Sequence, residues 1–143
     1  MAFISLFDYK TQIRDARLIQ MTDTDLSILP LVDSEAVAIV KNRLSSLYDT
    51  EGVFAQTGAN RDPLVLLFCK RIALYILHGR LPNAMIPPHI KDDYESTMAW
   101  LKAVSEGKTE LDLPHRQSDT DGDGIVDTPT SVFKWGSQPK RSV

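Results

Sequence analysis

The sequence has little of the chemistry that most enzymes and metal proteins need. Its 143 residues include one cysteine and three histidines. A single cysteine excludes an internal disulfide, and Cys69 stands in the most apolar run, where we expect a small buried side chain. No second histidine or cysteine stands three or four residues from any histidine, which argues against a zinc site. We therefore do not expect an enzyme.

The sequence also lacks a strong positive charge and a membrane-spanning run. The net charge is −3, whereas nucleic-acid-binding proteins usually have a strongly basic balance. The longest apolar run, PLVLLFCKRIALYIL, contains Lys70 and Arg71 and is too short to span a bilayer. The start, MAFISLFDYK, has no basic region followed by a long apolar stretch. We therefore expect a protein made and folded in a cytoplasm, without a membrane partner.

The sequence does show helical periodicity in four segments. This periodicity predicts an all-α bundle of about four helices. The first segment has Ser5 as N-cap and Asp8 three residues on, as in a capping box, and we expect a break near Ile19. The second is expected to begin at Asp33 or Ser34, because apolar residues then follow at helical spacing. These residues are Ala36, Val37, Val40, Leu44, Leu47 and Tyr48.

The third and fourth segments have the clearest boundaries. Asp62 precedes Pro63, which suits a first helical position, and Gly79 ends the third segment. Its apolar residues cover most of the circumference, so it is predicted to be the central helix. The fourth segment is expected to run from near Pro88 to Gly107, with one apolar stripe. The apolar residues are Leu64, Leu67, Phe68, Ile72, Tyr75 and Ile76 in the third segment, and Ile90, Tyr94, Met98, Leu101 and Val104, widened by Trp100, in the fourth.

The character of the sequence changes after Gly107, where few aliphatic residues and no helical period follow. We expect a helical body over residues 1–107 and an extended, largely non-helical C-terminal arm over residues 108–143. Aromatic residues near the arm's tip either anchor in a partner or fold back onto their own helices. The candidate partner-binding residues are Val132, Phe133 and Trp135, with the basic residues Lys134, Lys140 and Arg141.

Residues 119–127 of the arm alternate aspartates in the pattern of a calcium loop, with Gly124 at the sixth position. The twelfth position holds Thr130 instead of glutamate, and Pro129 excludes the exit helix of an EF-hand. The segment is similar to the Asp-rich loops of dockerin-like and thrombospondin-like repeats. It predicts either a weak Ca²⁺ site or an Asp-Gly turn without an ion. The candidate ligands are Asp119, Asp121, Asp123, the Ile125 carbonyl and Asp127.

The order of several stretches resembles the Mu-like prophage family of small virion neck proteins. The resemblance extends over nearly the whole chain and depends on order and spacing more than on any single motif. The stretches are DYKTQI, LYDTEGVFAQTGANRDPL, IALYILHGR, YESTMAWLKAVSEGKTELDLP and FKWGSQPKR.

This resemblance implies a helical head–tail connector, or adaptor, of a tailed phage. Such proteins form a ring, commonly of twelve copies, between the portal protein and the tail or a tail-completion protein. The implied location is the virion neck, after assembly in the host cytoplasm, with genome DNA passing through the ring without specific binding. The acidic balance agrees, since a conduit for DNA should not hold phosphates tightly.

Two other function classes remain open from the residues alone. A calcium-responsive binding module would act through the loop at residues 119–127. A helical DNA-binding accessory protein would need a basic face, whereas the basic residues are spread over separate segments.

The calcium hypothesis predicts that Asp121→Asn weakens binding strongly, because one of few charged ligands is lost. Calorimetric titration of the unmodified protein with calcium, followed by the variant, measures the effect. No heat from the unmodified protein at millimolar calcium would leave only the turn, for which the substitution is neutral or slightly stabilising.

Overall fold

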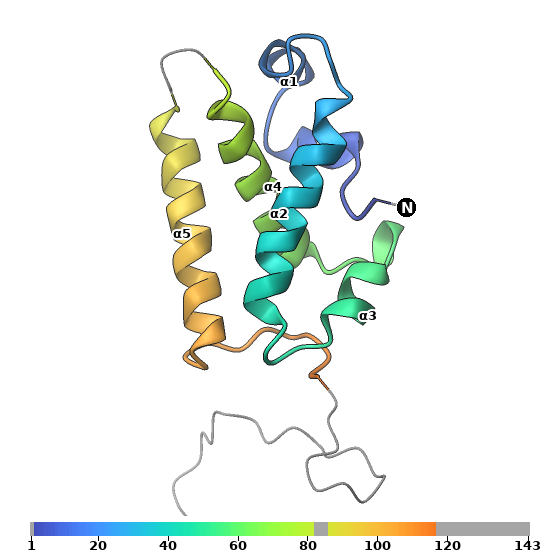
Figure 1. Ribbon diagram of the computed structural model, residues 1–143, viewed down its shortest axis with the longest axis vertical. Helices are drawn as coiled ribbons and strands as arrows, with labels where there is room; N and C mark the ends of the chain where they lie inside the picture. The colour runs from blue at the N-terminus through green and yellow to red at the C-terminus, as the bar shows by residue number, and fades with distance from the viewer. Residues whose placement is uncertain (1, 82–85, 117–143) are drawn as a thin grey trace, which may run out of the picture.

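The computed structural model describes residues 2–81 and 86–116. Within these ranges the chain forms packed helices and one isolated β-bridge, which confirms the all-α prediction (Figure 1). No helix in the described part is long and apolar enough to cross a membrane. The elements are η1 (Leu6–Thr11), α1 (Asp15–Met21), α2 (Ile28–Leu44), α3 (Thr50–Ala55), η2 (Gly58–Asn60), α4 (Pro63–His78) and α5 (Pro88–Ser105), where η denotes a 3-10 helix.

Helix α4 is the central helix, as predicted, and packs against both α2 and α5. Its start is fixed locally, because the Asp62 carboxylate accepts hydrogen bonds from the backbone N–H groups of Leu64 (3.0 Å) and Val65 (2.9 Å). Ile72 is fully buried, whereas Leu67, which we predicted in the core, is only half-buried. The other buried apolar residues of α4 are Val65, Phe68, Cys69, Ala73, Leu74 and Leu77.

Helix α5 has nearly the predicted bounds. Gly107 follows it with a φ of 75°, the left-handed conformation that glycine favours after a helix. The ring of Tyr94 stacks on Tyr75 of α4 with centroids 3.9 Å apart. Trp100 packs edge-on against Phe68, yet remains 40% exposed, so it lies at the rim of the core and not inside it.

Helix α2 begins at Ile28, so the predicted start at Asp33 or Ser34 is wrong by more than one turn. Pro30 falls in the first turn, where a missing N–H breaks no intrahelical hydrogen bond. The proline therefore lies within the helix and does not precede it.

The N-terminal segment forms two short helices, η1 and α1. Helix α1 ends at Met21, close to the break expected near Ile19, and a second break after Thr11 was not predicted. Tyr9 and Leu18 are both buried. In one continuous α-helix, residues nine positions apart would point in opposite directions, at about 100° per residue. Both side chains reach the core only because the helix is interrupted.

The first residues after Gly107 lie against the body, at the end where α2 terminates (Figure 1). Leu111 and Leu113 are buried. The Leu111 N–H donates to the Tyr48 hydroxyl (2.8 Å), and the Arg116 N–H donates to the Leu47 carbonyl (3.0 Å). Residues 108–116 therefore pack on the body. Residues 117–143 lie outside the described ranges, so an extended arm over those residues stays a prediction.

We expect Ile72→Ala to lower the free energy of unfolding by about 2–5 kcal/mol, because it opens a cavity in the core. Leu67→Ala should cost about 1 kcal/mol or less, since this side chain is half-buried. Urea unfolding of both variants measures the difference. Equal losses at the two positions would contradict the described orientation of α4.

Candidate interaction surface

The residues predicted as functional sites lie outside the described part of the chain. This holds for the calcium-ligand candidates Asp119, Asp121, Asp123, Ile125 and Asp127. It also holds for the partner-binding candidates Val132, Phe133, Lys134, Trp135, Lys140 and Arg141. Both sites stay predictions. Within residues 2–81 and 86–116, no group of three or more histidine, cysteine or acidic side chains is arranged to hold a metal ion.

Exposed apolar side chains gather in the N-terminal part of the fold. Trp100 is the one large exposed apolar residue that the described part places elsewhere. The N-terminal residues concerned are Leu6 (51% exposed), Phe7 (73%), Ile19 (43%), Leu26 (39%) and Leu31 (67%). Exposed apolar side chains that share one surface often mark a protein–protein contact site. Leu6, Phe7, Ile19 and Leu26 share such a surface, and Leu31 lies outside it.

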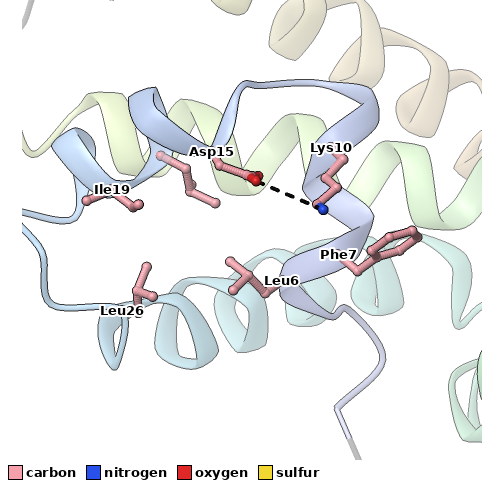
Figure 2. A pocket seen from close by; sticks show the side chains of 7 residues that line it. Leu6, Phe7, Lys10, Asp15, Ile19 and Leu26 are labelled. Atoms are coloured by element: carbon pink, nitrogen blue, oxygen red, sulfur yellow. Dashed lines mark ion pairs between the residues drawn. The ribbon is translucent and has the colours of Figure 1, made fainter.

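Most of these side chains border a groove of about 440 Å³ between η1, α1 and the start of α2. In Figure 2, Ile19 and Asp15 on α1 lie across the groove from Leu26 and Leu6, with Phe7 and Lys10 at one end. The only charged pair at the groove is Lys10 Nζ and Asp15 Oδ2, 4.0 Å apart, and the same ammonium lies 5.1 Å from the Phe7 ring centroid. We call this hollow the N-terminal groove; its lining residues are Leu6, Phe7, Lys10, Asp15, Leu18, Ile19 and Leu26.

A buried hydrogen bond holds η1 against α2. The Tyr9 hydroxyl donates to the Asp33 carboxylate, and both side chains are buried. Burial raises the pKa of Asp33 to about 6, although the tyrosine hydrogen bond opposes that shift. Burial and the neighbouring Asp33 carboxylate also raise the pKa of Tyr9. Tyr9 is buried, whereas Leu6 and Phe7 on the same short helix are exposed.

An ion pair ties the same segment to the residues before α4. Arg61 meets Asp8 with two parallel hydrogen bonds, Nη1 to Oδ2 (2.7 Å) and Nη2 to Oδ1 (3.0 Å), and its Nη1 also donates to the Phe3 carbonyl (2.7 Å). The Asp8 carboxylate additionally accepts from the backbone N–H of Ser5 (2.6 Å). Burial alone would raise the pKa of Asp8, but the hydrogen bonds from Arg61 and Ser5 outweigh it and lower the pKa to about 2.

A third link joins η1 to α4 itself. The buried Lys70 ammonium donates to the Thr11 hydroxyl (2.8 Å) and to the Asp8 carbonyl (3.2 Å). Burial lowers the pKa of this lysine. Links to α2, to Arg61 and to α4 thus fix one wall of the groove, so its apolar side chains are held on a firm base.

A second hollow, of about 530 Å³, lies between α3, the start of α4 and residues 112–114. Its polar groups are largely engaged within the fold. Asp49 accepts from the Gly52 N–H (3.1 Å), Asp62 caps α4, and Arg61 is paired with Asp8. This hollow is therefore a weaker candidate for an interaction site than the N-terminal groove.

Sequence reasoning missed the groove and the polar links behind it. Asp8 was recognised only for its capping pattern, and Lys70 only as an interruption of an apolar run. A usable signal was the row of large apolar residues Leu6, Phe7, Ile19, Leu26 and Leu31, which is more than the short N-terminal helices can bury.

The raised pKa of Asp33 predicts that the folded protein loses stability as the pH rises from about 4 to about 6. The folded protein keeps this proton up to pH about 6, whereas the unfolded chain releases it near the ordinary value of 3.8. The contribution of this proton to the free energy of unfolding is therefore fully present below pH 4. It is lost as the pH rises through 6, which lowers the free energy of unfolding by about 3 kcal/mol. Asp33→Asn should remove this slope, and Tyr9→Phe should steepen it because the carboxylate loses its donor.

Urea unfolding at pH 4, 5, 6, 7 and 8 measures these slopes. Parallel curves for the unmodified protein and Asp33→Asn would show that the carboxylate is not buried as described.

Comparison with known proteins gives a match to a phage family. The family described as "Bacteriophage Mu, Gp36" matches residues 59–127, slightly less than half of the chain. The matched range includes α4 and α5, whereas the N-terminal groove lies before it. No curated protein and no solved structure matches the chain. The match supports a Mu-like phage protein, of a structural or assembly kind.

Proposed function

We propose that the protein is a structural head–tail connector, or adaptor, of a tailed phage or prophage. It forms a ring between the portal protein and the tail or a tail-completion protein, and this ring completes the DNA-filled head without catalysis. The match to a phage Mu family over residues 59–127 supports the phage origin. The observation that carries the connector role is the N-terminal groove, a firmly held apolar surface on a small helical body.

The position of the groove suits a subunit that contacts neighbours on two sides. The groove lies beside the start of α2, and Arg116, from which the C-terminal residues continue, lies just beyond the end of α2. These ends are about 25 Å apart, since α2 has 17 residues at 1.5 Å each. A ring requires two different contact surfaces on each subunit, and the groove and the C-terminal residues supply them.

In this proposal the C-terminal residues bind neck partners through their aromatic and basic side chains. Trp135 is of a residue type that often dominates interface energies, and Phe133 adds a large apolar side chain beside it. Lys134, Lys140 and Arg141 meet an acidic rim. The net charge of −3 lets genome DNA pass the ring without tight binding to it. The protein then belongs in the virion neck.

Electron microscopy of the purified protein, alone and with portal protein, tests the proposal. We expect rings, and we expect Phe7→Asp and Ile19→Asp to abolish them while the helical circular dichroism is unchanged. Leu31→Asp is the matched control, because Leu31 is an exposed apolar residue that does not line the groove. Single chains that ignore the portal in every condition would refute the connector role.

Two truncations separate the contribution of the C-terminal residues to assembly from their contribution to folding. Ending the chain after Arg116 keeps every described contact, so we expect a folded body that still melts cooperatively and the loss of assembly with neck partners. Ending it after Gly107 also removes buried Leu111 and Leu113, which should destabilise the body by about 2–5 kcal/mol. Thermal unfolding and electron microscopy of both shortened proteins make the comparison. Normal assembly of the chain that ends at Arg116 would contradict a mechanical role for residues 117–143.

A further inference from the structure

We propose that in the free protein the N-terminal groove is occupied by the Val132–Trp135 segment of the same chain. The docked segment covers the apolar surface of a single subunit before any partner binds. This inference goes beyond the connector role and does not require a ring to form.

The groove has the size and chemistry for aromatic side chains. Its volume of about 440 Å³ falls in the range of hollows that enclose a compact ligand. Leu6, Phe7, Ile19 and Leu26 present apolar surface to it, and Leu18 forms a buried floor. Phe133 and Trp135 are the aromatic residues that the sequence carries after Arg116, so they are the natural apolar occupants from this chain.

The spacing and charge of the segment fit the groove as well. In an extended chain, alternate side chains point to the same side, so Phe133 and Trp135 enter together and Lys134 stays at the rim. There the Asp15 carboxylate is two-thirds exposed, and its contact with Lys10 is a loose 4.0 Å. A long lysine side chain can reach such a rim carboxylate while its head group remains in water.

The connecting chain has the right length. Fifteen residues, 117–131, separate Arg116 from Val132, and fifteen residues span at most about 50 Å when fully extended. The distance to cover is about 25 Å, because Arg116 lies beyond the end of α2 and Leu26 lies just before its start. A random coil of fifteen residues has a mean end-to-end distance of about 20 Å, so this span needs little stretching.

This match of lengths favours the same chain over a second copy. A tethered segment has its highest effective concentration, in the millimolar range, when the average length of the tether equals the distance between the two sites. A free second copy at micromolar concentration offers about a thousandfold less of the same segment. The intramolecular contact therefore forms first.

Tryptophan fluorescence tests the docking directly. In a Trp100→Phe background, Trp135 is the only tryptophan, and we expect short-wavelength emission that resists quenching by acrylamide. Phe7→Asp or Ile19→Asp should shift the emission to longer wavelength and increase quenching several-fold. Leu31→Asp, at an exposed site outside the groove, should change neither quantity. Emission typical of a fully exposed indole in the parent protein would overturn the proposal.

Dilution identifies the source of the segment. An intramolecular contact keeps the protected emission from about 10 μM down to about 10 nM, far below the effective concentration of a tether. Loss of protection on dilution would show that a second copy supplies the segment and would overturn the proposal.

A melting-temperature cycle supplies a second measurement that keeps Trp100. Phe7→Asp and Trp135→Ser should each lower the melting temperature, and the double variant should fall no further than the more affected single variant. Additive shifts would mean that the two residues do not touch. This outcome is separable from failure of the connector role, because it concerns the isolated chain and not the ring.

Discussion

The hydrogen bond from Tyr9 to the buried Asp33 carboxylate sets the position of the whole N-terminal segment. A buried polar pair of this kind has no alternative partners, so losing either side leaves an unpaired group in the core. The short helix η1 is therefore held with Tyr9 turned inward, while its other large apolar side chains, Leu6 and Phe7, are exposed. These two side chains line one wall of the apolar groove.

The Asp8–Arg61 pair and Lys70 hold this arrangement against the body from two other sides. Each link costs desolvation, and each is compensated by short, well-directed hydrogen bonds. Their combined effect is positional: they connect a short segment with little core of its own to α2, to the residues before α4, and to α4. Groove-lining side chains supported in this way lose little conformational freedom when a partner binds.

The proposed docking and the proposed ring depend on the same arrangement. The apolar groove lies at one end of α2, and the C-terminal residues begin at the other end. If the segment Val132–Trp135 occupies the groove of its own chain, the same contact is available between neighbours. Exchange of an identical element between copies is a low-cost route to an oligomer. Assembly then replaces an intramolecular contact with an equivalent intermolecular one.

Local chemistry in the sequence determined the helical class and the bounds of α4 and α5. The Asp62 cap, Pro63 and Gly107 act through their immediate neighbours, so their effect could be predicted without knowing the fold. The start of α2 at Ile28, the interruption after Thr11 and the groove were decided only by tertiary structure. The reason is that they depend on residues far apart in the sequence: Tyr9 and Asp33 are 24 positions apart, and Asp8 and Arg61 are 53 apart. No local pattern of helix propensity or apolar spacing contains those pairings, because they form only when the packed helices bring the segments together.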